Sequence, residues 1–388
     1  MVKQVKYGKI PAKLWLDEID EGTLKQVVNL SEFPFAFSHV ALMPDAHVGF
    51  GMPIGGVLAT KDVIIPNAVG VDIGCGMCAV RTEENFVSKE NLKKILGLIR
   101  KMVPVGFNHH QTKQDEKYMP VDNGVLGIDS IAAREYESAL KQVGTLGGGN
   151  HFIEIQRGDD GFIYLMIHSG SRNIGKQVAD YYNRQAGLIR EQQNDIPKSW
   201  MLDYLYIDSE TGNKYILEMN YCVEFALSNR KLMMERVKEA FTDVTGKDDF
   251  GELINIPHNY ASFENHFNTE VWVHRKGATR AEINETGIIP GSQGSKSYIV
   301  SGKGNPDSFR SCSHGAGRKL GRNDAQKRLS VDEESGKLDK LGVIHSIRTQ
   351  KDLDEAPSAY KDIHQVMNYQ QDLVEIITEL SPLAVIKG

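Results

Sequence analysis

Residues 67–80 read NAVGVDIGCGMCAV and place one acid and two of the chain's four cysteines among glycines. In a regular strand, residues three apart point to opposite faces, so Asp72 and Cys75 can share a ligand only if the chain turns between them. Gly74 and Gly76 permit that turn, because glycine adopts conformations that other residues avoid. A carboxylate and a thiolate that converge on one point form a pair of metal ligands. The alternative is a small buried cysteine beside an aspartate that caps a turn.

The composition is that of an ordinary globular protein. Hydrophobic residues make up 40% and charged residues 25% of the 388 residues, and 45 basic against 51 acidic residues give a formal charge of −6. Because the net charge is negative, a nucleic-acid partner must bind at a local basic patch. Four cysteines are too few for a disulfide framework and suit a reducing compartment. We expect Cys78, Cys222 and Cys312 to be packing residues.

No linker, low-complexity tract or repeat marks a domain boundary, so we predict one continuous domain over residues 1–388. The first residues lack the features of a secretory signal, and no apolar run is long enough to cross a bilayer. We expect a cytoplasmic protein without a membrane segment. We expect a monomer, an expectation that no feature of the sequence decides.

Helical periodicity predicts helices over residues 88–103, 175–193, 215–241 and 362–380. Short apolar runs predict strands at 57–60, 151–156, 162–167, 270–275 and 297–302. This mixture indicates an α+β fold, with central sheets flanked by helices. Glycine-rich turns border the strands in three blocks, 41–80, 144–175 and 287–320, where polar residues also gather. Such blocks are candidate site loops.

Three of the twelve histidines lie at the ends of predicted strands within or near these blocks: His151, His168 and His258. A lone histidine is more often a core or surface residue. Together with Asp72 and Cys75, however, the three favour a site for one or two transition metals. Imidazole and thiolate suit zinc, whereas an added carboxylate with open positions allows manganese or iron. Two such ions can activate an oxygen nucleophile and neutralise phosphate charge.

The third glycine-rich block has the composition of an anion-binding site. It is not a P-loop, because Ser295 separates Gly294 from Lys296. Residues 310–328 contain six basic residues and one acidic residue, a strip that suits phosphates. Within it, His314 lies among small residues. It could attack phosphorus as a nucleophile, bind a metal or act as a general acid, and residue types alone do not decide between these roles.

Eight motifs in order resemble the RtcB family of RNA-splicing ligases: LMPDAHVGFGMPIGG (42–56), GVDIGCGM (70–77), GTLGGGNHFIE (144–154), HSGSRNIG (168–175), HNYA (258–261), HRKGA (274–278), IIPGSQGSKSYIV (288–300) and SCSHGAGR (311–318). The resemblance runs from about residue 40 to the final VIKG. It implies an RtcB-like fold that is neither a Rossmann nor a P-loop fold. It also implies a GTP- and manganese-dependent enzyme that joins RNA 3′-phosphate or 2′,3′-cyclic phosphate ends to 5′-hydroxyl ends, in RNA repair or tRNA splicing.

Site residues follow from the same resemblance, position by position. His314 would carry GMP covalently, and the RNA end would then be activated as RNA-3′-pp-5′-G. Two Mn²⁺ ions would share Cys75 as a bridge, with His168 and His258 on one ion and Asp72 and His151 on the other. The implied guanosine contacts are Asn150, Glu154, Ser292, Ser297, Tyr360 and Lys387. The implied phosphate clamps are Arg172, Lys276 and Arg318. RNA is the implied partner, with an archease as a candidate activator.

Two details do not fit the pattern smoothly. A regular strand through residues 151–156 would put His151 and Glu154 on opposite faces, so either the strand begins later or the site wraps around its edge. Residues 104–125 diverge from the family, and we interpret His109 and His110 as parts of a solvated loop rather than as metal or RNA contacts. The chain is also shorter than archaeal and animal members, which favours a compact bacterial-type repair ligase. A cyclic phosphodiesterase that does not ligate, or a non-catalytic RNA-binding paralogue, is the alternative.

Overall fold

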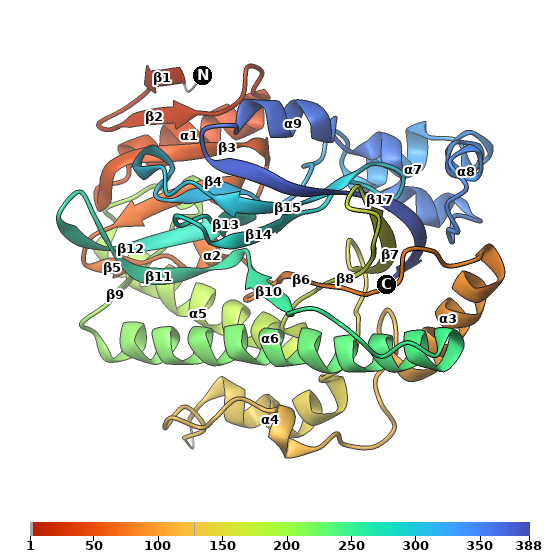
Figure 1. The fold of residues 1–388 in the computed structure, drawn as a ribbon. Coiled ribbons are helices and arrows are strands. Elements are labelled where there is room, and N and C mark those ends of the chain that lie inside the picture. Colours follow the sequence, from red (N-terminus) through yellow and green to blue (C-terminus); the bar gives the residue numbers. More distant parts are fainter. Residues whose placement is uncertain (1–2, 128) are drawn as a thin grey trace.

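Two large sheets form the centre of the structure, a computed structural model that describes residues 3–127 and 129–388 (Figure 1). The six-stranded sheet has the order β1 (Lys3–Lys6), β2 (Pro11–Leu14), β3 (Ala36–His47), β4 (Ile54–Thr60), β12 (Thr269–Lys276) and β11 (Asn259–His266). The seven-stranded sheet has the order β10 (Ile254–Pro257), β6 (Gly76–Arg81), β8 (Ile163–Ser169), β7 (Phe152–Gly158), β17 (Val374–Lys387), β15 (Ser297–Gly302) and β14 (Thr286–Ile289). The strand pairs are antiparallel except β2 with β3. This mixed α+β architecture confirms the predicted fold class.

Alternation along β3 and β4 explains how the six-stranded sheet is buried on both faces. Ala41, Met43 and Val57 contribute to a core shared with Tyr298 of β15 and with other residues of the second sheet. The intervening residues, such as Val40 and Leu58, point to the opposite face, where α1 (Glu21–Glu32) covers them. Successive side chains of a strand face opposite sides, so one apolar run supplies two cores.

The long helix α6 (Glu210–Thr245) organises the other side of the molecule. It begins at Ser209, whose side chain accepts a hydrogen bond from the Gly212 amide, and it ends at Gly246 in a left-handed conformation. Together with α3 (Lys89–Met102) it packs on one face of the seven-stranded sheet through Met233 and other apolar residues. Figure 1 shows α5 (Arg172–Gln193) beside α6, and α4 (Ile131–Gln142) below α6, where it packs against both helices.

The remaining elements are short. The helices are α2 (Pro66–Val69), α7 (Arg322–Arg328), α8 (Val331–Lys340) and α9 (Ile363–Tyr369), with 3-10 turns at Glu116–Tyr118, Lys198–Trp200, Pro306–Ser308, Gln350–Glu355 and Pro357–Ala359. Two small ribbons pair β5 (Val63–Ile64) with β9 (Leu205–Tyr206), and β13 (Ala278–Arg280) with β16 (Ser311–Ser313). Among the described residues, no helix is both long and apolar enough to cross a membrane.

The predicted helices at 88–103, 175–193 and 215–241 are confirmed, as are the five predicted strands. The predicted helix at 362–380 is wrong beyond Tyr369. The chain there forms β17, which runs between β7 and β15 and pairs with both. The segment IITEL within it contains β-branched residues that suit a pleated surface, and pairing on both edges outweighs the weak helical spacing.

Strand β7 begins at Phe152, one residue after His151. This later start settles the apparent conflict between His151 and Glu154, because His151 lies in the preceding turn and is free of the alternation of the strand. The last residue of the chain lies beside this turn. The Gly388 amide donates a hydrogen bond to the carbonyl of His151, so β17 ends against the same turn.

Candidate functional site

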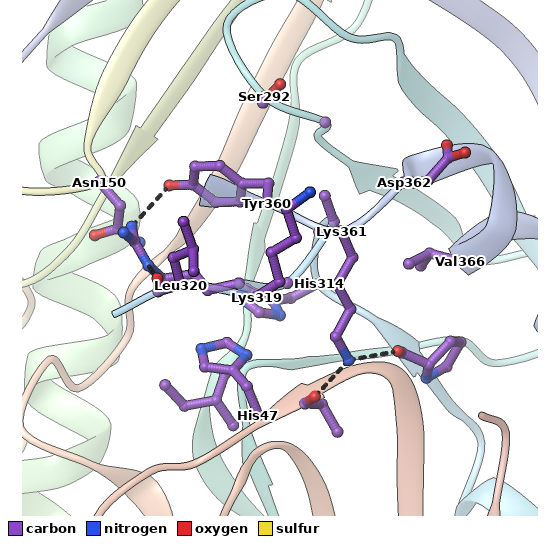
Figure 2. A pocket seen from close by; sticks show the side chains of 18 of the residues that line it. His47, Asn150, Ser292, His314, Lys319, Leu320, Tyr360, Lys361, Asp362 and Val366 are labelled. Carbon is purple, nitrogen blue, oxygen red and sulfur yellow. Dashed lines mark hydrogen bonds between the residues drawn. The ribbon is translucent and has the colours of Figure 1, made fainter. Parts of the chain in front are cut away.

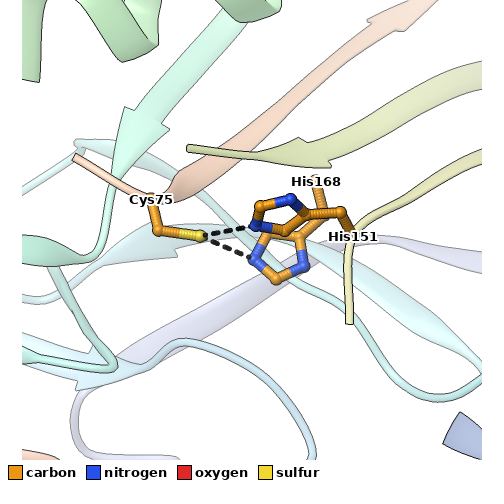
Figure 3. Close-up of side chains that lie close together, drawn as sticks. All are labelled: Cys75, His151 and His168. Carbon is orange, nitrogen blue, oxygen red and sulfur yellow. Dashed lines mark hydrogen bonds between the residues drawn. The ribbon is translucent and has the colours of Figure 1, made fainter. Parts of the chain in front are cut away.

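Four neighbouring strands end side by side and bring four of the predicted metal ligands together. In the order β10, β6, β8, β7, His258 follows β10, Cys75 precedes β6, His168 lies near the end of β8 and His151 precedes β7. The register agrees, because His168 pairs with both Met77 and Phe152 across its two edges. Figure 3 shows Cys75, His151 and His168 converging with the sulfur facing both rings. A set of residues distant in sequence therefore meets at one sheet edge.

The turn predicted between Asp72 and Cys75 is present. The amide of Cys75 donates to the carbonyl of Asp72 at 3.1 Å, and Gly74 has a φ of 72°. Helix α6 packs so closely here that a Cβ on Gly74 would lie 2.8 Å from Val223 Cα. A side chain at position 74 would therefore be strained and would also collide with the helix.

The donor atoms of all five predicted ligands form one continuous cluster. Asp72 Oδ2 lies 3.1 Å from His151 Nε2, which lies 3.5 Å from Cys75 Sγ. Cys75 Sγ lies 3.3 Å from His168 Nε2, which in turn lies 3.4 Å from His258 Nε2. The side chains of Cys75, His151 and His168 are buried and close enough to hold one metal ion. Thiolate, imidazole and carboxylate together suit a transition metal.

Hydrogen bonds outside the cluster fix the rings in the form that a metal requires. Nδ1 of His151 donates to the Leu146 carbonyl at 2.9 Å, and Nδ1 of His168 donates to the Asn150 carbonyl at 3.2 Å. With Nδ1 engaged in this way, Nε2 is the nitrogen of each ring that faces Cys75 and is available to a metal. Burial holds the pKa of His168 and of His258 well below the usual range, so the rings are neutral. These features fit the bound metal that the donor set implies.

The pKa values of the two anionic ligands, Asp72 and Cys75, are shifted in opposite directions. Burial alone would raise the pKa of Asp72, but contact with His151 outweighs it and lowers the value to about 2. Burial, together with the charge of Asp72, raises the pKa of the Cys75 thiol well above its usual range. A thiol in this setting becomes a thiolate when a cation compensates its charge.

Arg230 of α6 holds the backbone on both sides of the cluster. Its Nη1 donates to the carbonyl of Gly74 and to the carbonyl of Ser169, each at 2.9 Å. These carbonyls directly precede Cys75 and follow His168. The side chain is fully buried, and its Nε donates to Asn255 at 2.7 Å. Arg230 lies on a helix without a site motif, so nothing in the sequence indicates this role.

His314 follows β16 and is oriented by Asp45 near the end of β3. Nδ1 of His314 donates to Asp45 Oδ2 at 2.6 Å, and the amides of His314 and Gly315 donate to the same oxygen at 3.2 and 3.3 Å. Nε2 is consequently left with its lone pair. The ring of His314 lies 4.8 Å from that of His258, measured between centroids. Asp45 belongs to the motif that contains PDAH, but nothing in the sequence connects it to residue 314.

A cavity of about 1570 Å³ opens over His314. Several predicted site residues line it: Asn150, Glu154, His168, Ser292, His314, Arg318, Tyr360 and Lys387. Figure 2 shows Asn150 and Tyr360 on one side of His314 and His47 on another. His47 donates from Nδ1 to the Asp45 carbonyl at 3.1 Å, and Lys361 donates to the Ala46 carbonyl at 2.6 Å. The end of β3 is thus held in place beside His314.

Glu154 and Lys387 both line the cavity and are close enough for their charges to interact. Burial raises the pKa of Glu154 to about 7, against the opposing effects of Lys387 and Gln156. Lys387 Nζ donates to the Asn150 carbonyl at 3.3 Å and lies over the Phe152 ring. Ser297 lies deeper, and its Oγ accepts from Gln156 at 3.1 Å, so its contact with Glu154 is through that glutamine.

Arg318 is already engaged by a carboxylate that the sequence did not point to. Glu355 accepts hydrogen bonds from Arg318 and from Arg322 at 3.0 Å each, and also from the Tyr360 hydroxyl. Glu355 is 3% exposed. It therefore holds three cavity-lining side chains in position. No assigned motif surrounds residue 355, so the sequence carries no sign of this function.

The other two predicted clamps differ in setting. Arg172 begins α5 with a φ of 59° and lies beside Gly147. It is close enough to Asp72 for the two charges to interact. Its position next to the metal-ligand cluster suits a phosphate contact. Lys276 is buried, and its Nζ donates to the carbonyls of Phe50 at 2.6 Å and Asn67 at 2.8 Å. Its ammonium is therefore occupied by the backbone.

The solvated-loop interpretation of residues 109 and 110 is confirmed for one of them. His109 is exposed. His110 is half-buried, and its ring is 2.8 Å from Arg236 Nη1 and 3.3 Å from the Gly144 carbonyl. For His110 the interpretation is wrong, because these contacts attach the loop to α6.

Comparison with known proteins identifies relatives along nearly the whole chain. A family model described as tRNA-splicing ligase RtcB matches residues 26–388. The RNA-splicing ligase RtcB of Escherichia coli strain K12 is 38% identical over 405 aligned positions, which cover 97% of each chain. The tRNA-splicing ligase RtcB of Nanoarchaeum equitans is 33% identical, covering 95% of this chain and 92% of that protein. The RNA-splicing ligase RtcB of Mycobacterium tuberculosis is 30% identical, covering 94% of this chain and all of that protein.

Proposed function

Because the chain belongs to the RtcB family of RNA-splicing and tRNA-splicing ligases, it is an RNA ligase, and we propose that it joins RNA 3′-phosphate or 2′,3′-cyclic phosphate ends to 5′-hydroxyl ends with GTP and Mn²⁺. The observation that carries this proposal is the pairing of Asp45 with His314, which leaves Nε2 of the histidine free beside the metal-ligand cluster. A neutral imidazole held in this tautomer is a nucleophile.

The five clustered side chains, Asp72, Cys75, His151, His168 and His258, would hold two Mn²⁺ ions. Bound there, the ions would supply positive charge for phosphate oxygens and lower the pKa of water. The protein's own contribution is to keep the ring nitrogens of His151 and His168 pointed inward through their Nδ1 hydrogen bonds.

Catalysis then proceeds as three phosphoryl transfers. Nε2 of His314 attacks the α-phosphorus of GTP, a P–N bond forms, and the bond to pyrophosphate breaks. An oxygen of the RNA 3′-phosphate next attacks the same phosphorus, which breaks the P–N bond and yields RNA-3′-pp-5′-G. Finally the 5′-hydroxyl attacks the RNA phosphorus and GMP leaves. A cyclic phosphate is first opened by water to the 3′-phosphate. Positioning and charge neutralisation provide most of the acceleration in such transfers.

Guanine is recognised in the part of the cavity that Glu154 lines. The carboxylate of Glu154 can accept hydrogen bonds from N1 and N2 of guanine, a pattern that adenine does not offer. Asn150, Ser292, Tyr360 and Lys387 surround the nucleoside, and Ser297 supports Glu154 through Gln156. Arg318 and Arg172 meet the phosphates. We further propose that the enzyme acts in the cytoplasm as a monomer, and that an archease is its candidate activator.

Labelling with α-³²P GTP tests the proposal. In the presence of Mn²⁺ the protein should retain label that is labile to acid and stable to alkali, as expected for a bond between histidine and phosphorus. H314A should remain unlabelled, whereas H109A, which removes an exposed histidine, should be labelled like the wild type. Label that persists in H314A would contradict the assignment.

A joining assay separates ligase from phosphodiesterase. RNA with a 2′,3′-cyclic phosphate and RNA with a 5′-hydroxyl should be joined only when GTP is supplied. Opening of the cyclic phosphate without GTP-dependent joining would instead favour the phosphodiesterase alternative. The absence of any reaction would favour the non-catalytic paralogue.

A further inference from the structure

Phe50 is an exposed aromatic residue on the rim of the cavity that contains His314. Its side chain is 70% exposed although it lies in the loop between β3 and β4, which leads directly from the strand that carries Asp45. Both Phe50 and His47 line the cavity. Val48, two residues earlier, is 50% exposed and lines the same cavity, so the two side chains form an apolar patch beside the site, as binding surfaces do.

The backbone that carries this ring is fixed. Gln26 both donates to the Gly49 carbonyl, at 2.5 Å, and accepts from the Gly49 amide, at 3.1 Å. The Met52 amide donates to the Phe50 carbonyl at 2.8 Å. Gly51 has a φ of 69°, and a Cβ there would lie 2.3 Å from the Met201 carbonyl oxygen. The loop is therefore rigid, while its aromatic side chain remains uncovered.

Lys276 provides the most costly of these anchors. Its ammonium donates to the carbonyls of Phe50 and Asn67, and it is 7% exposed. Burial lowers the pKa of Lys276 to about 7. Burying a lysine is unfavourable, so placing one beneath an exposed loop indicates that the position of the loop matters.

The cavity has room for a second ligand on this side. Its volume of about 1570 Å³ exceeds the roughly 300–1,000 Å³ that is usual for a small-molecule site. Glu154, Tyr360 and Lys387 belong to the part assigned to guanosine. Ile54, the first residue of β4 after this loop, lies near His314, because a Cβ on Gly277 would be 2.4 Å from Ile54 and 3.1 Å from His314.

We propose that Phe50 stacks on the base of the terminal nucleotide of the RNA 3′-phosphate end, and so holds that end against His314. The inference rests on the proposed function and adds to it the subsite for RNA. The 3′-phosphate must approach the phosphorus carried by His314, and Phe50 stands beside that approach. Every base has a flat face, so stacking accepts any sequence, as a repair enzyme requires.

The experiment uses protein already loaded with labelled GMP, mixed with RNA that ends in a 3′-phosphate. We expect F50A to raise the RNA concentration needed for half-maximal transfer of GMP by roughly tenfold, the usual effect of removing one stacking partner. F50W should transfer like the wild type. The matched control is F86A, because Phe86 is 69% exposed and belongs to a different part of the surface.

A second arm removes the base instead of the ring. RNA whose terminal nucleotide is abasic should react with the wild type as poorly as normal RNA does with F50A, and F50A should show no further loss with the abasic RNA. Equal transfer by F50A and wild type on normal RNA would overturn the proposal. So would a difference between F50A and wild type that is as large on abasic RNA as on normal RNA.

Loading with GMP from GTP is measured separately. It should be unchanged in F50A, because the guanosine contacts lie elsewhere, and a matching loss in loading would overturn the assignment of Phe50 to RNA. Failure of the wild type to load at all would instead overturn the proposed function, and the subsite with it.

Discussion

The carboxylate of Asp45 accepts a 2.6 Å hydrogen bond from Nδ1 of His314, although 269 positions separate the two residues in the sequence. Burial alone would raise the pKa of Asp45, but His314 and Lys361 outweigh that effect and lower it. The aspartate therefore stays ionised and acts only as an acceptor. It keeps the proton of the imidazole on Nδ1 and the lone pair on Nε2.

The variant D45N tests this orientation. An asparagine amide can donate to Nδ1, which would move the ring proton to Nε2 and remove the nucleophilic lone pair. We expect formation of the histidine–GMP bond to slow by about a hundredfold or more, with little change in GTP affinity. Rapid-quench labelling gives the rate, and D208N, at an exposed position, is the control. Unchanged labelling by D45N would contradict the role of Asp45.

Among the four cysteines, Cys75 alone should affect metal binding. C75A should lower the affinity for Mn²⁺ by roughly a hundredfold, since even residues that support metal ligands change affinity by about 10–100-fold. C222A removes an equally buried thiol from the core around α6 and should cost only stability. Calorimetric titration of the metal-free protein measures both affinities. Equal affinities would exclude Cys75 as a ligand.

Guanosine binding should depend on the ionisation of Glu154. With a pKa of about 7, its carboxyl accepts hydrogen bonds above that pH and becomes protonated below it. Affinity for guanosine should therefore rise as the pH is raised through about 7, and fall by roughly tenfold per pH unit below it. The free nucleoside is used so that phosphate titration does not contribute. E154Q should bind weakly with no such pH dependence, and a similar slope in E154Q would assign the effect to another group.

Arg230 should act on the metal site through the backbone. R230Q removes the bonds to the Gly74 and Ser169 carbonyls, so Cys75 and His168 lose their fixed separation. We expect Mn²⁺ affinity to fall by about 10–100-fold, together with a loss of several kcal/mol of unfolding free energy. R275Q is the matched control, because Arg275 is also fully buried but binds Glu264 in the sheet. Equal metal affinities in the two variants would show that only stability is involved.

The sequence predicts the local elements well where one signal dominates. The helix at 215–241 and the strand at 162–167 have strong periodicity or a continuous apolar run, and both are confirmed. The helix predicted over residues 370–380 is wrong because the conformation of this segment depends on the strands with which it pairs. Strand β17 exists through pairing with β7 and β15, which lie far away in sequence. Spacing within one segment does not contain that information.

For the site, the predictable part consists of residues that carry distinctive chemistry. The predicted ligands Asp72, Cys75 and His168 are reactive types among glycines, and the structure brings them together. Three other residues act instead by holding another residue in place: Asp45, Arg230 and Glu355. The residues next to them in the sequence do not indicate this role. Lys276 is the reverse case, because its motif predicts a phosphate contact, whereas its hydrogen bonds to the Phe50 and Asn67 carbonyls have no sign in the sequence.

The residues of the proposed site extend along the chain from Asp45, which binds His314, to Lys387 in β17, and β17 lies between β7 and β15. No early portion of the chain contains both the nucleophile's partner and the last lysine. Completion of the site therefore depends on residues 374–387 pairing with strands formed by residues 152–158 and 297–302, so the site is assembled only together with the whole second sheet.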